Sequence, residues 1–316
     1  MTSVFAQFLV SLLFLIISAR LLLKCIESFA SKIRISPLII GATLIAIGTS
    51  LPETSVAISA IAQHVPEISF GDIVGSNIAN ICLVLGFGIL VFPIRIGTTK
   101  TQKNNIILLV LTLVFITLLS IPHDLSRFLG IGLVIFYLVF LIVEIFWGRI
   151  GGLKEDKKTI AHLDKSKGNI FIYLLGIVAS LAGLVFSSKF LVSSVIVISK
   201  LLKINDEIIG LTVIAIGTSL PELATTFVSG FKKEWKLIYG DIQGSNVYNL
   251  SVIGAVLLVF GGQSPPIGAF SLTFLAISTI SIIFLSYKYE GTNIPRFYGL
   301  FYLLAYVAYI FVLYKF

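Results

Sequence analysis

The sequence has little charge, few cysteines and few histidines, and each shortage excludes a class of protein. Only 12% of its 316 residues are charged, about half the share found in soluble globular domains. Cys25 and Cys82 lie far apart, within or beside apolar segments, so we expect buried thiols rather than a disulfide framework. His64, His123 and His162 lie in short polar connections without metal-ligand spacing. The sequence therefore predicts neither a soluble domain nor a thiolate or imidazole metal site.

Long hydrophobic runs are abundant. Hydrophobic residues make up 57% of the chain, and the mean hydropathy is +1.05. Apolar runs near 20 residues recur along the whole length, which is typical of transmembrane helices. The short alternating strands of a membrane β-barrel are not seen. We expect an all-α polytopic membrane protein with ten transmembrane helices, at about residues 4–23, 37–62, 69–93, 105–121, 126–147, 169–199, 206–231, 238–260, 267–286 and 297–314.

The basic residues predict how these spans are oriented. The polar segment 148–169 divides the ten spans into two halves of five, residues 1–147 and 170–316. Of the 23 lysines and arginines, 18 lie on the side of that segment and 5 on the other side. The basic side of a membrane protein is the cytoplasmic one. We therefore expect a cytoplasmic loop 148–169, both termini outside the cell membrane, and a net charge of +8 that reflects topology rather than nucleic-acid binding.

Two motifs occur once in each half. GATLIAIGTSLPE at 41–53 is matched by GLTVIAIGTSLPE at 210–222, and GDIVGSNIAN at 71–80 by GDIQGSNVYN at 240–249. Both pairs are offset by 169 positions, so the spacing between the motifs is also repeated. Because each half has an odd number of spans, the second half enters the membrane from the opposite side. The sequence therefore predicts an inverted repeat.

The first motif places oxygen-bearing side chains in the middle of a span. In a helix the residues Ala46, Thr49, Ser50 and Glu53 share one face. Pro52 cannot donate a backbone hydrogen bond, so a kink that frees backbone carbonyls is expected there. Irregular backbone at membrane depth is tolerated where it lines a polar cavity or is buried in protein.

The second motif adds further oxygen ligands. Ser76 and Asn80 are one helical turn apart and share a face, whereas Asn77 points elsewhere and is expected to bond a neighbouring helix. Carboxylate, hydroxyl, amide and carbonyl oxygens suit calcium and sodium rather than softer metals. Two inverted copies would bring these groups together near the midplane, with the second copy supplying Thr218, Ser219, Glu222, Ser245 and Asn249.

Other interpretations of these residues compete with ion binding. Glu53 and Glu222 have no basic residue within helical reach, which disfavours a structural ion pair, and intramembrane acids are usually functional. The serines and threonines could instead bond carbonyls one turn back, and the residues of the second motif could bond across helices. Asp72 and Asp241 are best explained as helix caps, or otherwise as a cation vestibule. Glu144, near the cytoplasmic edge, is expected to snorkel.

GTSLPE followed by GSNIAN, and GTSLPE followed by GSNVYN, resemble the two alpha-repeats of the sodium/calcium exchanger family of cation/calcium antiporters. The resemblance covers nearly the whole chain. It implies the fold of two inverted five-helix repeats and sodium-for-calcium exchange without a cofactor or enzymatic activity. It also implies a ligand set for the two transported ions, made of Ala46, Thr49, Ser50, Glu53, Ser76, Asn80, Ala215, Thr218, Ser219, Glu222, Ser245 and Asn249.

The residue at 249 bears on the ions that are coupled. Potassium-dependent exchangers and some prokaryotic members have aspartate where this chain has Asn249, so the resemblance is to the potassium-independent type. With neutral asparagines the ligand set carries two negative charges, those of Glu53 and Glu222. One calcium ion would neutralise it, and the resemblance suggests three sodium ions in exchange.

Three further functions remain as alternatives. A proton-coupled or other divalent-cation antiporter would use the same fold. An intramembrane aspartyl protease is suggested by the Gly-Asp pairs at 71–72 and 240–241, but its GxGD motif is missing. A passive channel needs no alternating gates, and the inverted repeat argues against it. The expected partners are the transported ions and the lipid bilayer, and no obligate protein partner is evident.

Overall fold

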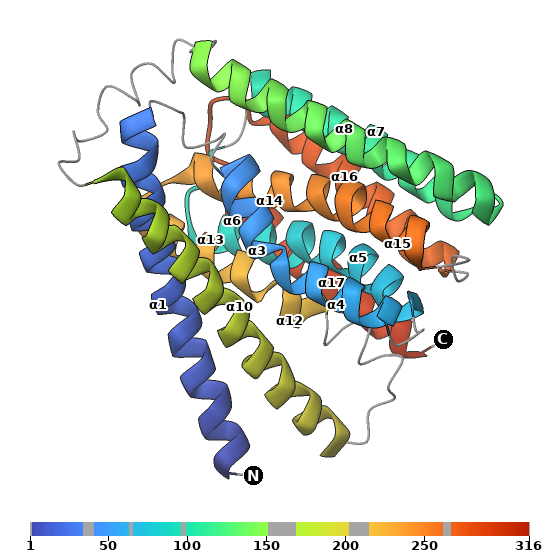
Figure 1. The fold of residues 1–316 in the computed structure, drawn as a ribbon, viewed down its shortest axis with the longest axis horizontal. Coiled ribbons are helices and arrows are strands. Elements are labelled where there is room, and N and C mark those ends of the chain that lie inside the picture. Colours follow the sequence, from blue (N-terminus) through green and yellow to red (C-terminus); the bar gives the residue numbers. More distant parts are fainter. Residues whose placement is uncertain are drawn as a thin grey trace.

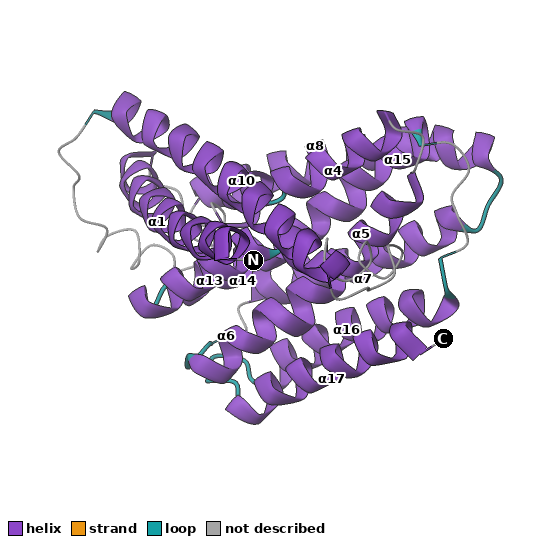
Figure 2. Ribbon diagram, turned by 90° about the horizontal axis from the view of Figure 1, so that it is seen from below, coloured by secondary structure: helices purple, strands orange, loops and turns teal. Residues whose placement is uncertain are grey.

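A computed structural model of the chain describes residues 2–33, 41–62, 66–95, 99–150, 169–201, 215–261 and 267–315. Helices form almost all of this part, and no β-strand occurs in it (Figures 1 and 2). This confirms the all-α class. Within the described residues, three short π-helical turns, labelled η, adjoin or interrupt the α-helices. In the first half the elements are α1 (Thr2–Ile33), η1 (Gly41–Ile45), α3 (Ala46–Thr49), α4 (Leu51–Ala62), α5 (Pro66–Ala79), η2 (Asn80–Leu85), α6 (Gly86–Val91), α7 (Thr99–Leu119) and α8 (His123–Ile150).

The second half repeats this order. Its elements are α10 (Ile170–Leu201), α12 (Ala215–Thr218), α13 (Leu220–Lys232), α14 (Trp235–Tyr248), η4 (Asn249–Ile253), α15 (Gly254–Phe260), α16 (Ala269–Lys288) and α17 (Arg296–Lys315). Seven described helices are long and apolar enough to cross a membrane, and the bent pair Ala42–Thr49 and Leu51–Ala62 makes eight if it is one span. The segments 34–40 and 202–214, where two of the ten expected spans begin, lie outside the described residues, as do His64, His162 and most of the loop 148–169.

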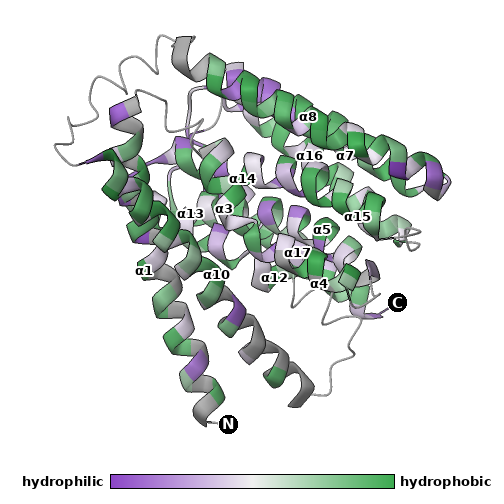
Figure 3. Cartoon of the chain, in the orientation of Figure 1, coloured by the Kyte–Doolittle hydropathy of each residue, from purple (hydrophilic) through white to green (hydrophobic). Residues whose placement is uncertain are grey.

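The outer helices face the hydrocarbon of the membrane. Their exposed side chains are largely apolar, for example Phe128 on α8, Phe171 on α10 and Phe311 on α17, and Figure 3 shows hydrophobic residues along these helices. A soluble protein would bury such residues. Together with the apolar spans, this identifies an integral membrane protein.

The first helices of the two halves, α1 and α10, run side by side along one flank of the molecule (Figure 1). Small residues allow the close approach, as is common between membrane helices. A side chain at Gly176 would collide with Cys25, and one at Gly183 with Ser18. Cys25 and Cys82 are both buried, which confirms the expectation of buried thiols.

Two interrupted helices form the centre of the fold. The spans Ser69–Val91 and Trp235–Phe260 are the most buried of those described. Each packs against the broken helix of the other half: α14 contacts η1 and α3, and α5 contacts α12. At Gly244 an added Cβ would lie 2.6 Å from that of Ala46. The two repeats are therefore interleaved at the positions where the sequence motifs lie.

Glu144 does not snorkel to the surface, so that interpretation was wrong. Its carboxylate lies 2.7 Å from the ammonium group of Lys100, and both side chains are buried between α7 and α8. The side-chain amide of Asn104 donates a further hydrogen bond of 3.2 Å. A buried acid needs such compensation, and a lysine 44 positions earlier supplies it.

Candidate cation site

Each repeat contains a helix that is broken one turn before its glutamate. In the first repeat α3 and α4 meet at Ser50 with a bend of 49°. Ser50 has φ −86° and ψ 12°, and Ser219, between α12 and α13, has φ −80° and ψ 4°, values outside the α-helical region. Pro52 and Pro221 follow, and each leaves the carbonyl four positions earlier without its helical donor. The kink expected at Pro52 is therefore confirmed, and the backbone of Ser219 marks the equivalent interruption in the second half.

A triangle of oxygen atoms connects the first broken helix to α14. The hydroxyl of Thr49 lies 3.1 Å from Asp241 Oδ1 and 3.3 Å from the hydroxyl of Ser245. The Ser245 hydroxyl lies 3.5 Å from the same aspartate oxygen. All three side chains are buried. The first half thus contributes one corner and the second half two.

A second triangle reproduces this arrangement with the halves exchanged. The Thr218 hydroxyl lies 3.1 Å from Asp72 Oδ1 and 3.1 Å from the hydroxyl of Ser76. Ser76 donates to the same aspartate oxygen at 3.2 Å. Ligands of sodium or calcium at right angles are about 3.4 Å apart when the metal–oxygen distance is near 2.4 Å. Both triangles therefore have the dimensions of one face of a coordination shell.

The two glutamates that follow the helix breaks are fully buried. Glu53 and Glu222 have no exposed surface. The Ser50 hydroxyl donates to Glu222 Oε1 at 3.4 Å, but the other oxygen of Glu222 and both oxygens of Glu53 have no hydrogen-bond partner in the described structure. The ion pair found in the described structure joins Lys100 and Glu144 and does not involve these two glutamates. Unpaired buried carboxylates are very costly, so this arrangement is stabilised when the carboxylates bind a cation or a proton.

Asn80 and Asn249 occupy equivalent positions, at the start of η2 and η4. Asn80 donates to Asn246 Oδ1 at 3.0 Å and keeps its own buried oxygen unpartnered, while neither polar atom of the Asn249 side chain has a partner. Single π-helical turns are often found at functional sites. The side-chain amide of Asn77 donates to the Ile73 carbonyl of its own helix at 2.7 Å. The expected bond to a neighbouring helix is made by the backbone carbonyl of Asn77 instead, which accepts from the Asn246 side chain at 3.4 Å.

The twelve predicted residues are all buried, but only some are in direct contact. Side-chain bonds link Thr49 to Ser245, Thr218 to Ser76, and Ser50 to Glu222. The carbonyls of Ala46 and Ala215 lie 3.4 and 3.3 Å from the hydroxyls of Thr49 and Thr218. Ser219 has a buried hydroxyl without a described partner. No group of three or more His, Cys, Asp or Glu ligands is found among the described residues, so an ion here would depend on hydroxyl, amide and carbonyl oxygens.

Sequence reasoning missed the place of Asp72 and Asp241. Both lie inside their helices, because α5 begins at Pro66 and α14 at Trp235, so the interpretation as helix caps was wrong. Thr225 was also missed: it donates to the second oxygen of Asp241 and to the Glu222 carbonyl at 3.0 Å. The sequence did contain a signal for the two aspartates. Each lies four residues before the serine of its GSN motif, which places both side chains on one face of the helix.

The comparisons with known proteins agree on one family. The profile described as "Sodium/calcium exchanger protein" matches residues 3–146 and again residues 172–315. The start and the end of the second match both lie 169 positions after those of the first, which is the offset of the motifs. The profile therefore recognises the same unit in each half.

Several relatives cover the chain almost completely. The sodium/calcium exchanger MaX1 of Methanosarcina acetivorans is 30% identical in an alignment of 348 positions, gaps included, that covers 98% of each chain. The putative antiporter CaxA of Alkalimonas amylolytica is 32% identical over 312 residues, 97% of each chain. A solved structure of the sodium-calcium exchanger NCX_Mj, soaked with 2.5 mM Na+ and 0.1 mM Ca2+, has a TM-score of 0.80, 26% identity and 98% coverage of both chains.

Proposed function

The chain belongs to the sodium/calcium exchanger family, a family of cation antiporters rather than enzymes, and we propose that it exchanges sodium for calcium by alternating access. The observation that carries this proposal is the pair of oxygen triangles. Each contains a threonine from one half and an aspartate and a serine from the other. A site assembled from both halves changes when the halves move against each other, which is what a carrier requires.

In this proposal calcium binds between the two glutamates. Glu53 and Glu222 supply the negative charge that a divalent ion needs, and their unpartnered buried oxygens support this role. Hydroxyl, amide and backbone oxygens complete the shell. The proposed ligands are Ala46, Thr49, Ser50, Glu53, Ser76, Asn80, Ala215, Thr218, Ser219, Glu222, Ser245 and Asn249.

Sodium would use the same oxygens in smaller groups. The two oxygen triangles offer separate positions for monovalent ions, and we propose that three sodium ions, the number that the resemblance to the family suggests, replace one calcium ion. The two ions then exclude each other because both need the glutamates. Neutral Asn249, with no hydrogen-bond partner in the described structure, is consistent with exchange that needs no potassium.

The proposed architecture is that of ten spans in two inverted halves, 1–147 and 170–316. In this arrangement the loop 148–169 is cytoplasmic, and both termini lie outside the cell membrane. The paired family matches to both halves support the repeat, and the distribution of lysine and arginine supports the orientation.

Calcium uptake into proteoliposomes under an imposed sodium gradient, compared with an imposed pH gradient, tests the driving ion. We expect uptake with the sodium gradient and little with the pH gradient, in buffers free of potassium. Uptake driven by pH alone would instead support the second candidate, a proton-coupled or other divalent-cation antiporter of the same fold. The observation that favours this candidate is the presence of two further buried acids, Asp72 and Asp241.

A further inference from the structure

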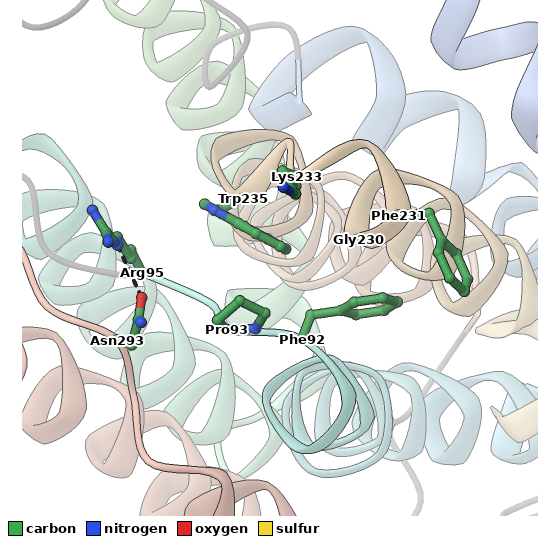
Figure 4. Close-up of a pocket in the computed structure, with 8 residues that line it drawn as sticks. All are labelled: Phe92, Pro93, Arg95, Gly230, Phe231, Lys233, Trp235 and Asn293. Carbon is green, nitrogen blue, oxygen red and sulfur yellow. Dashed lines mark hydrogen bonds between the residues drawn. The ribbon is translucent and has the colours of Figure 1, made fainter.

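A cavity lined by none of the candidate site residues lies at one end of the transmembrane helices. It has a volume of about 530 Å³ and is lined by aromatic side chains together with two cations and an amide, namely Phe92, Phe231, Trp235, Arg95, Lys233 and Asn293. Figure 4 shows Arg95 beside Asn293 at one end of this cleft and Phe231 at the other, with Pro93 and Trp235 between them.

The residues of the cleft lie at the ends of apolar spans, where a boundary of the membrane is expected. Arg95 follows the span Ser69–Val91, Lys233 follows α13, Trp235 begins the span Trp235–Phe260, and Asn293 lies between α16 and α17. Tryptophan and basic residues are typical of this interfacial region. The ligands that are most abundant at this depth are phospholipid headgroups.

The aromatic wall of the cleft is firmly packed. The ring of Phe92 is 5.3 Å from that of Phe231 in an edge contact and 6.4 Å from that of Trp235. A side chain at Gly230 would collide with the Phe92 ring. Because these contacts fix the wall without a ligand, the cleft is preformed.

The two cations have no acidic partner in the described part of the chain. Arg95 donates to Asn293 Oδ1 at 2.9 Å through Nε, which orients its guanidinium group and leaves the other N–H groups for a ligand. Lys233, in a left-handed turn with φ 61°, is exposed. Neither forms an ion pair with a described residue. Two unpaired cations above an apolar wall are complementary to an amphiphilic anion.

We propose that this cleft binds an anionic phospholipid, with its phosphate at Arg95 and Lys233 and an acyl chain along Phe231. Phe231 is 65% exposed and provides apolar surface on the membrane side. Basic pockets at the ends of transmembrane helices bind such headgroups. A zwitterionic phospholipid brings its own cation to the site and binds less well.

The bound lipid would connect the two halves of the protein. Arg95 belongs to the first half, whereas Lys233 lies in the turn between α13 and α14, the helices that carry Glu222 and Ser245. A phosphate held by both cations restrains that turn against the first half. This consequence rests on the proposed function: in an alternating-access exchanger, a lipid bound here would restrain the motion of the two halves.

The chain provides its own reporter for this site, because it has two tryptophans, Trp147 and Trp235. In a Trp147→Phe protein the fluorescence comes from Trp235 in the cleft. Reconstitution with brominated phosphatidylglycerol, whose bromines quench tryptophan on contact, should quench more strongly than brominated phosphatidylcholine. The Arg95→Gln and Lys233→Gln variants should each bind the anionic lipid about fivefold more weakly.

Arg296→Gln is the matched control, because Arg296 is exposed at the start of α17 and does not line the cleft. It should leave the quenching unchanged. Equal quenching by both lipids, or equal loss in all three variants, would overturn the proposal. Relief of the quenching by millimolar inorganic phosphate would also overturn it, by showing that the site takes a soluble anion. The assay measures no transport, so its outcome is independent of the proposed exchange.

Discussion

The hydroxyl of Thr49, in the first half of the chain, lies 3.1 Å from a carboxylate oxygen of Asp241 in the second half. Thr218 and Asp72 form the reciprocal contact at the same distance. Each half therefore completes the polar groups of the other, and the candidate cation site is assembled from residues of both halves. This relationship motivates the following predictions.

Replacing either glutamate should abolish calcium exchange. In Glu53→Gln and Glu222→Gln one carboxylate remains, and it cannot compensate a divalent ion in a buried site. We expect residual calcium flux in proteoliposomes near the level of empty vesicles. Glu290→Gln is a suitable control because Glu290 is exposed. Near-normal flux in either buried variant would refute the role of these residues.

Replacing the aspartates should weaken cation binding without unfolding the protein. Asparagine in Asp72→Asn or Asp241→Asn keeps the oxygen that faces threonine and serine but removes the charge. The loss of a nearby negative charge acts more strongly on a divalent than on a monovalent ion. The half-saturating calcium concentration should rise at least about tenfold, and that of sodium less. Unchanged values would mean that the aspartates only position the hydroxyls.

The buried pair Lys100–Glu144 gives a prediction for stability. Glu144→Gln leaves the ammonium group of Lys100 buried without its partner, which should cost about 3–5 kcal/mol. Thermal unfolding in detergent would measure this as a lower Tm. The double variant Lys100→Met/Glu144→Leu should recover most of the loss. If the single variant is as stable as the parent protein, the ion pair is not shielded from solvent as the structure indicates.

The orientation can be tested by cysteine labelling. In a Cys25→Ala/Cys82→Ala background, a cysteine in Gly151→Cys should label only after the cells are opened, because the loop 148–169 is expected to be cytoplasmic. Thr2→Cys should label in intact cells with an impermeant reagent. The opposite pattern would reverse the predicted topology.

Exchange of three sodium ions for one calcium ion should move one net charge per cycle. A potential of about 100 mV acts on that charge with about 2.3 kcal/mol, so it should bias the direction of transport. Recording from liposomes in potassium-free solution should show a current during sodium-dependent calcium exchange. Electroneutral exchange would contradict the proposed ratio, and a requirement for potassium would contradict the interpretation of Asn249.

The sequence predicted those features of the candidate site that are local. The helical spacing of Thr49, Ser50 and Glu53, and the missing donor at Pro52, depend only on neighbouring residues, and the structure confirms the break at Ser50. The repeated motif also indicated that a second, equivalent segment exists.

Features that depend on tertiary contacts were not predictable in this way. Asp72 resembles a helix cap as long as α5 is thought to begin near it, and only the contact with Thr218 reveals its role. Glu144 resembles a snorkelling residue until Lys100 is placed beside it. The π-helical turn at Asn80 has no sequence signature.

Competition between the two ions for the purified protein tests the central claim most directly. Labelled calcium bound at equilibrium should be displaced by sodium at constant pH in potassium-free buffer, and the Glu53→Gln protein should bind none. Calcium binding that sodium does not reduce would contradict a shared site for the two ions.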